Sequence, residues 1–305
     1  MRKLTSLIAA AIVVALPATA IGQTAPFFDG RPVAGPDPMV LGSYDPHGDF
    51  TDDTTPLIEH LFLPWLDIDL ATLALADGYA RERGRDLWIT VEPWTWDQSR
   101  RITPTELRQG IFSGQYDVVI DGLCGEIGRL QSKTTVRFAQ EMEDKTGRFI
   151  WSDWAPEDYI QAYRYFVERC RVGTPQSRFM WSPKGEDGLQ AYYPGDDVVD
   201  DVGLSIFALQ EYDQDKFGRD RFFAERVQPG YDLTVPFGKP IYVAELGYRG
   251  KQAYVGQWAT DSLLDYEQFP ALLGVCYFND IEVVPWEETY GLPDWRVTDN
   301  IVAED

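Results

Sequence analysis

The chain has 305 residues, with 27 Lys or Arg against 49 Asp or Glu, so its formal net charge is −22 at pH 7. A surface this acidic repels nucleic acid, anionic lipid and acidic polysaccharides, whereas neutral partners are not disfavoured. Only three cysteines and two histidines are present, which leaves little material for a zinc site or a Ser–His–Asp triad. We therefore expect no metal, no cofactor and no nucleic-acid partner.

Residues 1–22 have the features of a signal peptide. Arg2 and Lys3 are followed by an almost unbroken apolar run over 4–16 and then by small residues up to Ala20. The apolar run is shorter than the roughly 18 residues that a membrane span needs. We expect cleavage after Ala20 or Gly22, no membrane span afterwards, and a secreted or periplasmic protein.

The chain after the signal peptide reads as a single (β/α)₈ TIM barrel over residues 39–305, preceded by a Pro- and Gly-rich extended lead-in over 23–38. Short apolar runs alternate with amphipathic stretches, and no linker interrupts them, so we expect one domain and a monomer. The expected strands are Met39–Tyr44, Leu57–Leu63, Leu87–Glu92, Thr134–Glu141, Ser177–Ser182, Val199–Phe207, Pro240–Leu246 and Leu272–Phe278. The expected helices are Asp69–Arg83, Tyr116–Gln131, Pro156–Arg171, Phe217–Arg226 and Gln252–Leu264.

The three cysteines, Cys124, Cys170 and Cys276, lie far apart in the sequence. Export would permit one disulfide. Cys124 and Cys170 are expected on successive helices but at different heights along the barrel. We therefore expect all three thiols to be buried and unpaired.

Two glutamates end expected strands on opposite sides of the barrel mouth, which is where TIM barrels place their active sites. Glu141 ends the fourth strand and Glu245 the seventh. Retaining glycosidases use two carboxyls about 5–5.5 Å apart, one as nucleophile and one as acid/base. A single glutamate at a strand end is more often a salt-bridge partner, but the pair predicts catalysis. The carboxyls should then approach within roughly 4–6 Å.

Several segments in the same order resemble glycoside hydrolase family 26. The principal ones are Val136-Arg137-Phe138-Ala139-Gln140-Glu141-Met142, Tyr192-Tyr193-Pro194-Gly195-Asp196-Asp197-Val198-Val199-Asp200 and Ile241-Tyr242-Val243-Ala244-Glu245-Leu246-Gly247. Shorter ones are Glu92-Pro93-Trp94, Ser113-Gly114-Gln115-Tyr116-Asp117, Trp181-Ser182-Pro183 and Pro293-Asp294-Trp295-Arg296. The resemblance runs from about residue 39 to 297 and implies double displacement, with Glu141 as acid/base and Glu245 as nucleophile.

Two residues depart from the pattern of that family. The family usually has His before the acid/base, where this chain has Gln140, and often has Tyr at the end of strand 6, where we expect Phe207. Gln can donate a hydrogen bond but cannot carry a proton as His can. Both departures adjoin the sugar that is cleaved, so they concern the choice of backbone more than the hydrolytic chemistry.

The chemistry requires Glu141 to hold a proton in the resting enzyme and Glu245 to be ionised. We expect Arg137, Gln140 or Asn279 to donate to Glu245, with Arg137 the first choice. Aromatic rings at the mouth should bind pyranose faces, although each could equally belong to the core. The expected substrate-binding residues are Arg137, Gln140, Trp94, Trp151, Trp181, Tyr193, Phe207 and Asn279.

These observations predict a secreted retaining endo-β-glycan hydrolase that acts on a neutral β-linked polysaccharide. The resemblance implies β-1,4-mannan first, with β-1,3-1,4-glucan and β-1,3-xylan as rarer substrates. A second possibility is a hydrolase of an exopolysaccharide that the producing cell exports. An alternative of another class is a non-catalytic glycan-binding relative, which the presence of both glutamates argues against.

Overall fold

The computed structural model describes residues 28–303, which fold around a closed barrel of eight parallel strands. The order is β6-β5-β4-β3-β2-β1-β8-β7, and pairing of β6 with β7 closes the barrel. The barrel strands are β1 (Val40–Tyr44), β2 (Ile58–Pro64), β3 (Asp86–Glu92), β4 (Thr134–Phe138), β5 (Arg178–Trp181), β6 (Asp201–Leu209), β7 (Ile241–Lys251) and β8 (Leu272–Phe278), and β9 (Ile301–Val302) pairs with the end of β7. The predicted (β/α)₈ barrel is confirmed. The expected signal peptide and residues 23–27 lie outside the described residues.

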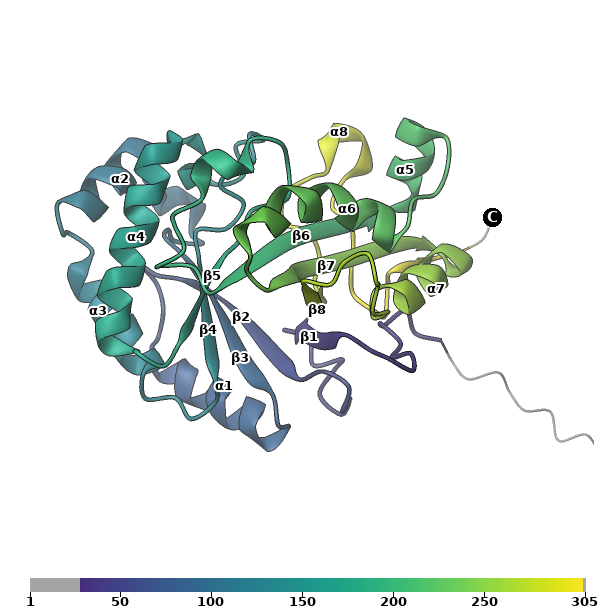
Figure 1. Ribbon diagram of the computed structural model, residues 1–305, viewed down its shortest axis with the longest axis horizontal. Helices are drawn as coiled ribbons and strands as arrows, with labels where there is room; N and C mark the ends of the chain where they lie inside the picture. The colour runs from purple at the N-terminus through teal and green to yellow at the C-terminus, as the bar shows by residue number, and fades with distance from the viewer. Residues whose placement is uncertain (1–27, 304–305) are drawn as a thin grey trace, which may run out of the picture.

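Helices surround the strands, with α2, α3 and α4 on the left of Figure 1 and α5, α6 and α7 on the right. The helices are α1 (Ala71–Glu82), α2 (Pro104–Phe112), α3 (Asp117–Ile127), α4 (Pro156–Gly173), α5 (Gln210–Phe217), α6 (Phe223–Thr234), α7 (Gln252–Asp261) and α8 (Glu287–Tyr290). Four short 3₁₀ turns cover Gln98–Arg100, Ile150–Asp153, Leu189–Tyr192 and Val235–Phe237. Within residues 28–303, no helix is both long and apolar enough to cross a bilayer.

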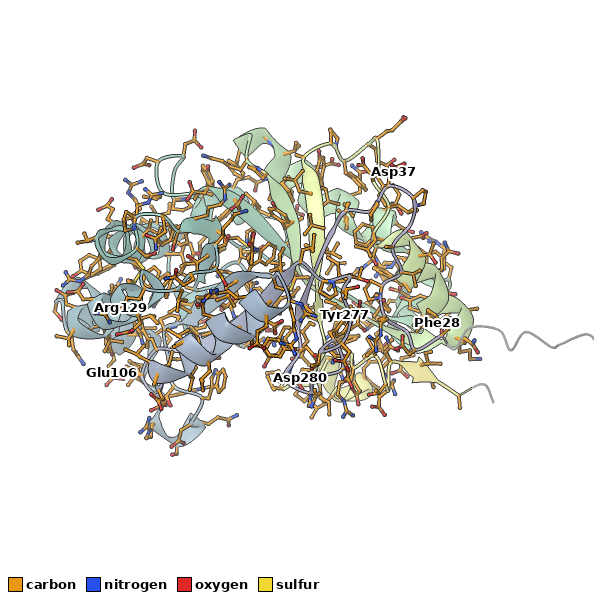
Figure 2. The ribbon with its side chains drawn as sticks, turned by 90° about the horizontal axis from the view of Figure 1, so that it is seen from below. Phe28, Asp37, Glu106, Arg129, Tyr277 and Asp280 are labelled. Atoms are coloured by element: carbon orange, nitrogen blue, oxygen red, sulfur yellow. A yellow bond between two sulfur atoms is a disulfide. The ribbon has the colours of Figure 1, made fainter. Side chains whose placement is uncertain are left out.

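The strands bury both faces, as expected for a parallel barrel covered by helices. Leu87, Ile89 and Val91 of β3 belong to the large apolar core, whereas Trp88 belongs to a small separate apolar cluster. Figure 2 shows side chains filling the molecule, with Tyr277 of β8 inside it. The barrel is therefore a packed core, and a site can form only at its ends.

The expected helix Phe217–Arg226 is wrong, because the chain forms two helices there. Helix α5 ends at Phe217, and Gly218 follows with a left-handed φ of 68°, a conformation that glycine adopts without strain. Helix α6 begins only at Phe223. Helix α2 was not predicted either, and it begins with a capping box between Thr103 and Glu106.

A disulfide joins Cys124 of α3 to Cys170 of α4, which corrects the expectation of three unpaired thiols. The helices are level at their carboxyl ends: each cysteine lies three residues before its helix ends, at 127 and 173. The chain packs tightly here, since a Cβ on Gly128 would lie 2.1 Å from the Gly173 carbonyl oxygen. Small residues thus bring the two helices close enough for the bond. Cys276 is free and buried, as expected.

Candidate active site

The end of β4 presents the expected acid/base through a strained backbone. The strand stops at Phe138 rather than at Glu141, because Ala139 and Glu141 adopt left-handed φ values of 48° and 54°. They are the only residues other than glycine with positive φ in the described chain. The Glu141 amide donates to the Ser182 carbonyl oxygen at 2.8 Å, which ties this turn to the end of β5. Strain of this kind is concentrated at functional sites.

The expected nucleophile lies on β7 beside an irregularity in the strand pairing. Leu204 pairs with Val243, but the next residue of β6, Ser205, pairs with Glu245, so Ala244 is an extra residue on β7. A bulge of this kind changes the direction of the following side chain. Glu245 is 4% exposed, and its Oε1 accepts a hydrogen bond of 2.5 Å from Nη1 of Arg137.

Arg137 is itself held by a chain of polar groups inside the barrel. Its Nη1 lies 3.4 Å from Oγ1 of Thr90, which lies 2.7 Å from Nε2 of His60, and Nδ1 of His60 lies 3.5 Å from the Cys276 sulfur. Because Arg137 can only donate, Thr90 accepts from it and directs its own proton to His60. Burial lowers the pKa of His60 well below its usual range, so this ring stays neutral.

The two carboxyls interact electrostatically. The pKa of Glu245 is raised to about 7, because burial raises it, Arg137 lowers it and the negative charge of Glu141 raises it. We expected the proton to reside on Glu141 and Glu245 to be ionised. The structure instead places a raised proton affinity on Glu245.

Gln140, next to the acid/base, belongs to a second polar group centred on Glu92. Nε2 of Gln140 donates to Glu92 Oε1 at 2.9 Å, and Glu92 Oε2 accepts from the indoles of Trp94 at 3.0 Å and Trp96 at 2.7 Å. The Gln140 Oε1 atom is buried without a hydrogen-bond partner. It is therefore a free acceptor beside the acid/base. The Trp96 side of this group faces solvent, since this residue is 52% exposed.

A cleft of about 490 Å³ opens beside Glu141 at the carboxyl ends of the strands. Three further acids and three bases line it, together with aromatic and small polar residues. The lining residues are Glu141, Asp144, Thr146, Arg148, Lys184, Glu186, Ser205, Phe207, Tyr212, Arg226, Glu282, Val284, Pro285 and Trp286. Arg148 interacts electrostatically with both catalytic candidates. Burial lowers its pKa, but the negative charges of Glu282, Glu141 and Glu245 together raise it by more.

Several residues expected to bind substrate lie elsewhere. Trp151 and Trp181 are fully buried, so the expectation that their rings form open platforms is corrected. Trp151 donates to the Gln140 carbonyl oxygen at 2.7 Å and so supports the acid/base turn. Tyr193 stacks on Phe237 with ring centroids 3.9 Å apart, and these two rings pack against Trp181.

Asn279 and Trp94 also have structural partners. Asn279 donates to Asp45 at 2.7 Å and to Asp49 at 2.8 Å, so it organises the loop after β1 instead of donating to Glu245. Trp94 is buried and lies 4.9 Å from Trp151, centroid to centroid. Of the three expected donors to Glu245, Arg137 alone reaches it.

The aromatic residues that do line the cleft were missed by the sequence analysis, Phe207 excepted. Tyr212 and Trp286 form an edge-to-face pair with centroids 5.8 Å apart. Trp286 follows β8 by eight residues (286 minus 278), beyond the strand-end segments that the sequence analysis considered. The loop after β8 brings Trp286 to the cleft in the folded chain.

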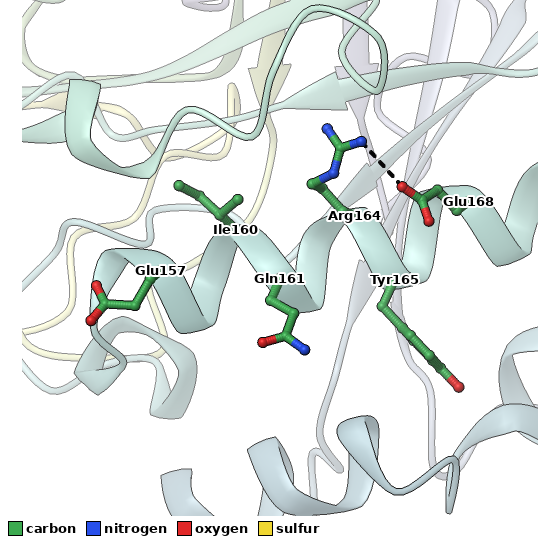
Figure 3. A pocket seen from close by; sticks show the side chains of 6 residues that line it. All are labelled: Glu157, Ile160, Gln161, Arg164, Tyr165 and Glu168. Carbon is green, nitrogen blue, oxygen red and sulfur yellow. Dashed lines mark hydrogen bonds and ion pairs between the residues drawn. The ribbon is translucent and has the colours of Figure 1, made fainter.

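A second hollow, shown in Figure 3, lies on the outer face of α4 and has a different character. Its six lining residues all come from that one helix, and two of them, Arg164 and Glu168, pair with each other at 3.2 Å. Chemical groups from different elements do not converge there. The cleft at the barrel mouth is therefore the candidate active site, and the fold and the site define a (β/α)₈ barrel protein with two buried carboxyls at its mouth.

Comparisons with known proteins agree with this class. The model of glycosyl hydrolase family 26 matches residues 83–222, just under half of the chain. A β-1,3-xylanase from Alcaligenes sp is 33% identical over 144 residues, which are 45% of this chain and 28% of that protein. A β-1,3-xylanase from Vibrio sp is 32% identical over the same shares. The match thus spans less than a third of the length of these curated relatives.

Solved structures share the fold at lower identity. A family 26 β-mannanase from Bacteroides ovatus has 17% identity and a TM-score of 0.59, with 86% of each chain covered. The catalytic domain of an endo-β-1,4-mannanase from Bacillus sp. JAMB-750 has 15% identity and a TM-score of 0.57, covering 79% of this chain and 77% of that one. These similarities establish the barrel and its topology.

Proposed function

We propose that the chain is a retaining endo-β-glycan hydrolase in which Glu245 is the nucleophile and Glu141 the acid/base. The observation that carries this proposal is the 2.5 Å hydrogen bond from Arg137 to Glu245, next to a second buried carboxyl at the end of β4. Arg137 stabilises the ionised form of Glu245 that attacks an anomeric carbon. The match of residues 83–222 to the model of glycosyl hydrolase family 26 supports the same assignment.

In the first step, Glu245 attacks the anomeric carbon, and Glu141 gives its proton to the departing glycosidic oxygen. The resulting ester has no negative charge on Glu245. Glu141, now a carboxylate, then removes a proton from the attacking water, and the sugar leaves with its original anomeric configuration. Two carboxyls roughly 4–6 Å apart satisfy this mechanism, whereas a separation near roughly 9 Å would favour inversion.

We propose cleavage within the chain of the polysaccharide, because aromatic residues flank the site on two sides. The indole of Trp96 follows β3, and that of Trp286 follows β8, three strands away around the barrel. Rings on both sides can hold sugars on both sides of the cleaved bond. Export through a signal peptide is supported by the Cys124–Cys170 disulfide, since such bonds persist in oxidising compartments.

For the backbone, β-1,4-mannan is the first candidate, because the similar solved structures include β-1,4-mannanases. A second candidate is β-1,3-xylan, which is favoured by the higher identity of the curated relatives named β-1,3-xylanase. The test is a panel of β-1,4-mannan, β-1,3-xylan and β-1,3-1,4-glucan with analysis of product length and of the first anomer released, by proton NMR. Oligosaccharides of retained configuration are expected. Binding without cleavage of any polymer would indicate the non-catalytic glycan-binding alternative.

A further inference from the structure

Arg226 is a cation in the cleft that has no carboxylate partner. It lies in the first turn of α6, half-buried, and its Nη2 donates to the carbonyl oxygen of Phe207 at 2.9 Å. Its Nε atom is buried without any hydrogen-bond partner. No acidic side chain that the structure describes forms an ion pair with it, so most of its hydrogen-bonding capacity is unused.

A second arginine, Arg221, and a carboxylate, Asp213, interact electrostatically with Arg226. This carboxylate accepts two hydrogen bonds from Arg221, at 2.9 and 2.7 Å. Burial and the charge of Arg221 lower the pKa of Arg226. The first turn of a helix is also the positive end of its dipole. A cation in such a place is costly unless an anion binds to it.

The other two bases of the cleft are already neutralised. Arg148 pairs with Glu282 at 2.9 Å, and Lys184 pairs with Glu186 at 2.7 Å. Arg226 is therefore the base of this cleft that is available to a ligand. An arginine without a carboxylate partner is distinctive in a chain whose net charge is −22.

The groups next to Arg226 are suited to a sugar. Phe207 accepts its hydrogen bond through the backbone, and Tyr212 and Trp286 line the same cleft with apolar rings. Aromatic faces can bind the apolar face of a pyranose while a polar group fixes its substituents. This combination provides stacking and one cationic contact within a single part of the cleft.

We propose that Arg226 binds a carboxylate carried by the substrate, so that the preferred glycan contains uronic acid residues or acidic branches on its β-linked backbone. The planar guanidinium matches a carboxylate with parallel hydrogen bonds. This proposal rests on the proposed hydrolase function and extends it from neutral backbones to acidic ones. Repulsion by the distant acidic surface is screened at physiological salt, whereas the direct contact is not.

The test compares two forms of one polymer. A β-mannan with glucuronic acid branches is assayed beside the same polymer after carbodiimide activation and borohydride reduction, which convert each carboxylate to an uncharged alcohol. For the unmodified enzyme, kcat/KM should be about tenfold or more higher on the acidic form, as expected for a charge-assisted hydrogen bond. Arg226→Gln should lose this preference, mainly through KM, so that the acidic and the reduced form are cleaved with kcat/KM values within about twofold of each other. Arg226→Lys should retain part of it.

Arg219→Gln is the matched control, since Arg219 is exposed and pairs with Glu225 outside the cleft. It should leave both substrates unchanged. Equal kcat/KM of the unmodified enzyme on both forms would overturn the proposal, even if Arg226 variants fold poorly. A parallel loss on both forms in Arg226→Gln would also overturn it, as would a preference only for a sulfated mannan. If no polymer is cleaved, including the neutral panel, the hydrolase function itself fails.

Discussion

Two non-glycine residues in left-handed conformation, Ala139 and Glu141, frame Gln140 at the end of β4. Each such residue costs on the order of 1–3 kcal/mol, so the surrounding structure must hold the turn in place. Two hydrogen bonds do so: the Glu141 amide donates to the carbonyl oxygen of Ser182, directly after β5, and the Trp151 indole donates to the carbonyl oxygen of Gln140. This turn interrupts the strand after Phe138 and places Glu141 in the lining of the cleft.

The roles of the two glutamates predict different behaviour of their variants. Glu245→Ala should lower kcat by at least about a thousandfold on all substrates, because no nucleophile remains. Glu141→Ala should retain the first step on aryl glycosides with good leaving groups, which need little acid assistance, and azide should restore turnover. Pre-steady-state assays on activated and natural substrates measure this. Equal loss on both, with no azide effect, would contradict the acid/base role.

The polar chain from Arg137 through Thr90 to His60 predicts that a substitution of Thr90 changes the pH dependence of kcat/KM. The pKa of Glu245 is raised to about 7, so kcat/KM should fall as pH drops through this region and the nucleophile becomes protonated. Thr90→Val removes a contact that positions Arg137, the group that lowers this pKa, so the acid limb should move to higher pH. The control is Thr260→Val on the exposed face of α7. An unchanged acid limb with reduced activity would mean that Thr90 has only a packing role.

The departures from the family pattern predict a shift in backbone preference. Gln140 offers an unused acceptor beside the acid/base, and Phe207 lines the cleft without a hydroxyl. A site that pairs with one hydroxyl orientation rejects the other strongly. The double variant Gln140→His with Phe207→Tyr should therefore change the mannan-to-glucan ratio of kcat/KM by about tenfold or more. If the unmodified enzyme already prefers mannan by a wide margin, this hypothesis is wrong.

At the scale of elements, the disulfide between α3 and α4 should stabilise the outer ring without affecting the cleft. The bond closes a loop with a sequence separation of 46, and the loop-entropy relation gives about 4 kcal/mol for this length. The double variant Cys124→Ala with Cys170→Ala should therefore lower the free energy of unfolding by about 3–4 kcal/mol, measured by urea denaturation. The kcat of the folded enzyme should not change. No stability loss would show that the helices are held by packing alone.

The elements also show where sequence patterns suffice. The strands of the barrel lie where apolar runs predict them, because a strand buried on both faces must be apolar along its length. Thr103, Pro104 and Glu106 form a helix-start pattern for α2, which was not recognised in the sequence. The junction of α5 and α6 depended on Gly218, whose left-handed conformation was not evident from its neighbours.

For the whole molecule, export should remove the only apolar segment long enough to resemble an anchor. Loss of Arg2 and Lys3 with the signal peptide changes the formal charge from −22 to −24. Intact-mass spectrometry of the exported protein should place its first residue after Ala20 or after Gly22. Recovery of the full-length chain in the membrane fraction would contradict the cleavage.

The barrel, its strand order and the two catalytic candidates followed from the sequence alone, because the hydrophobic period and the strand ends are local properties of the chain. Arg137 could be expected as the partner of Glu245 for the same reason: both occupy ends of strands in one barrel. The acceptor of the Gln140 amide, Glu92, could not be chosen in advance, since several polar groups of the mouth compete for it.

Tertiary structure alone decided which aromatic residues are walls of the cleft and which are core. Packing between strands and helices buries Trp151 and Trp181, whereas a loop after β8 carries Trp286 to the cleft. The disulfide depended on the relative height of two helices, which a sequence does not specify. The unpaired state of Arg226 likewise arises because Asp213 is taken by Arg221, a competition that only the folded chain resolves.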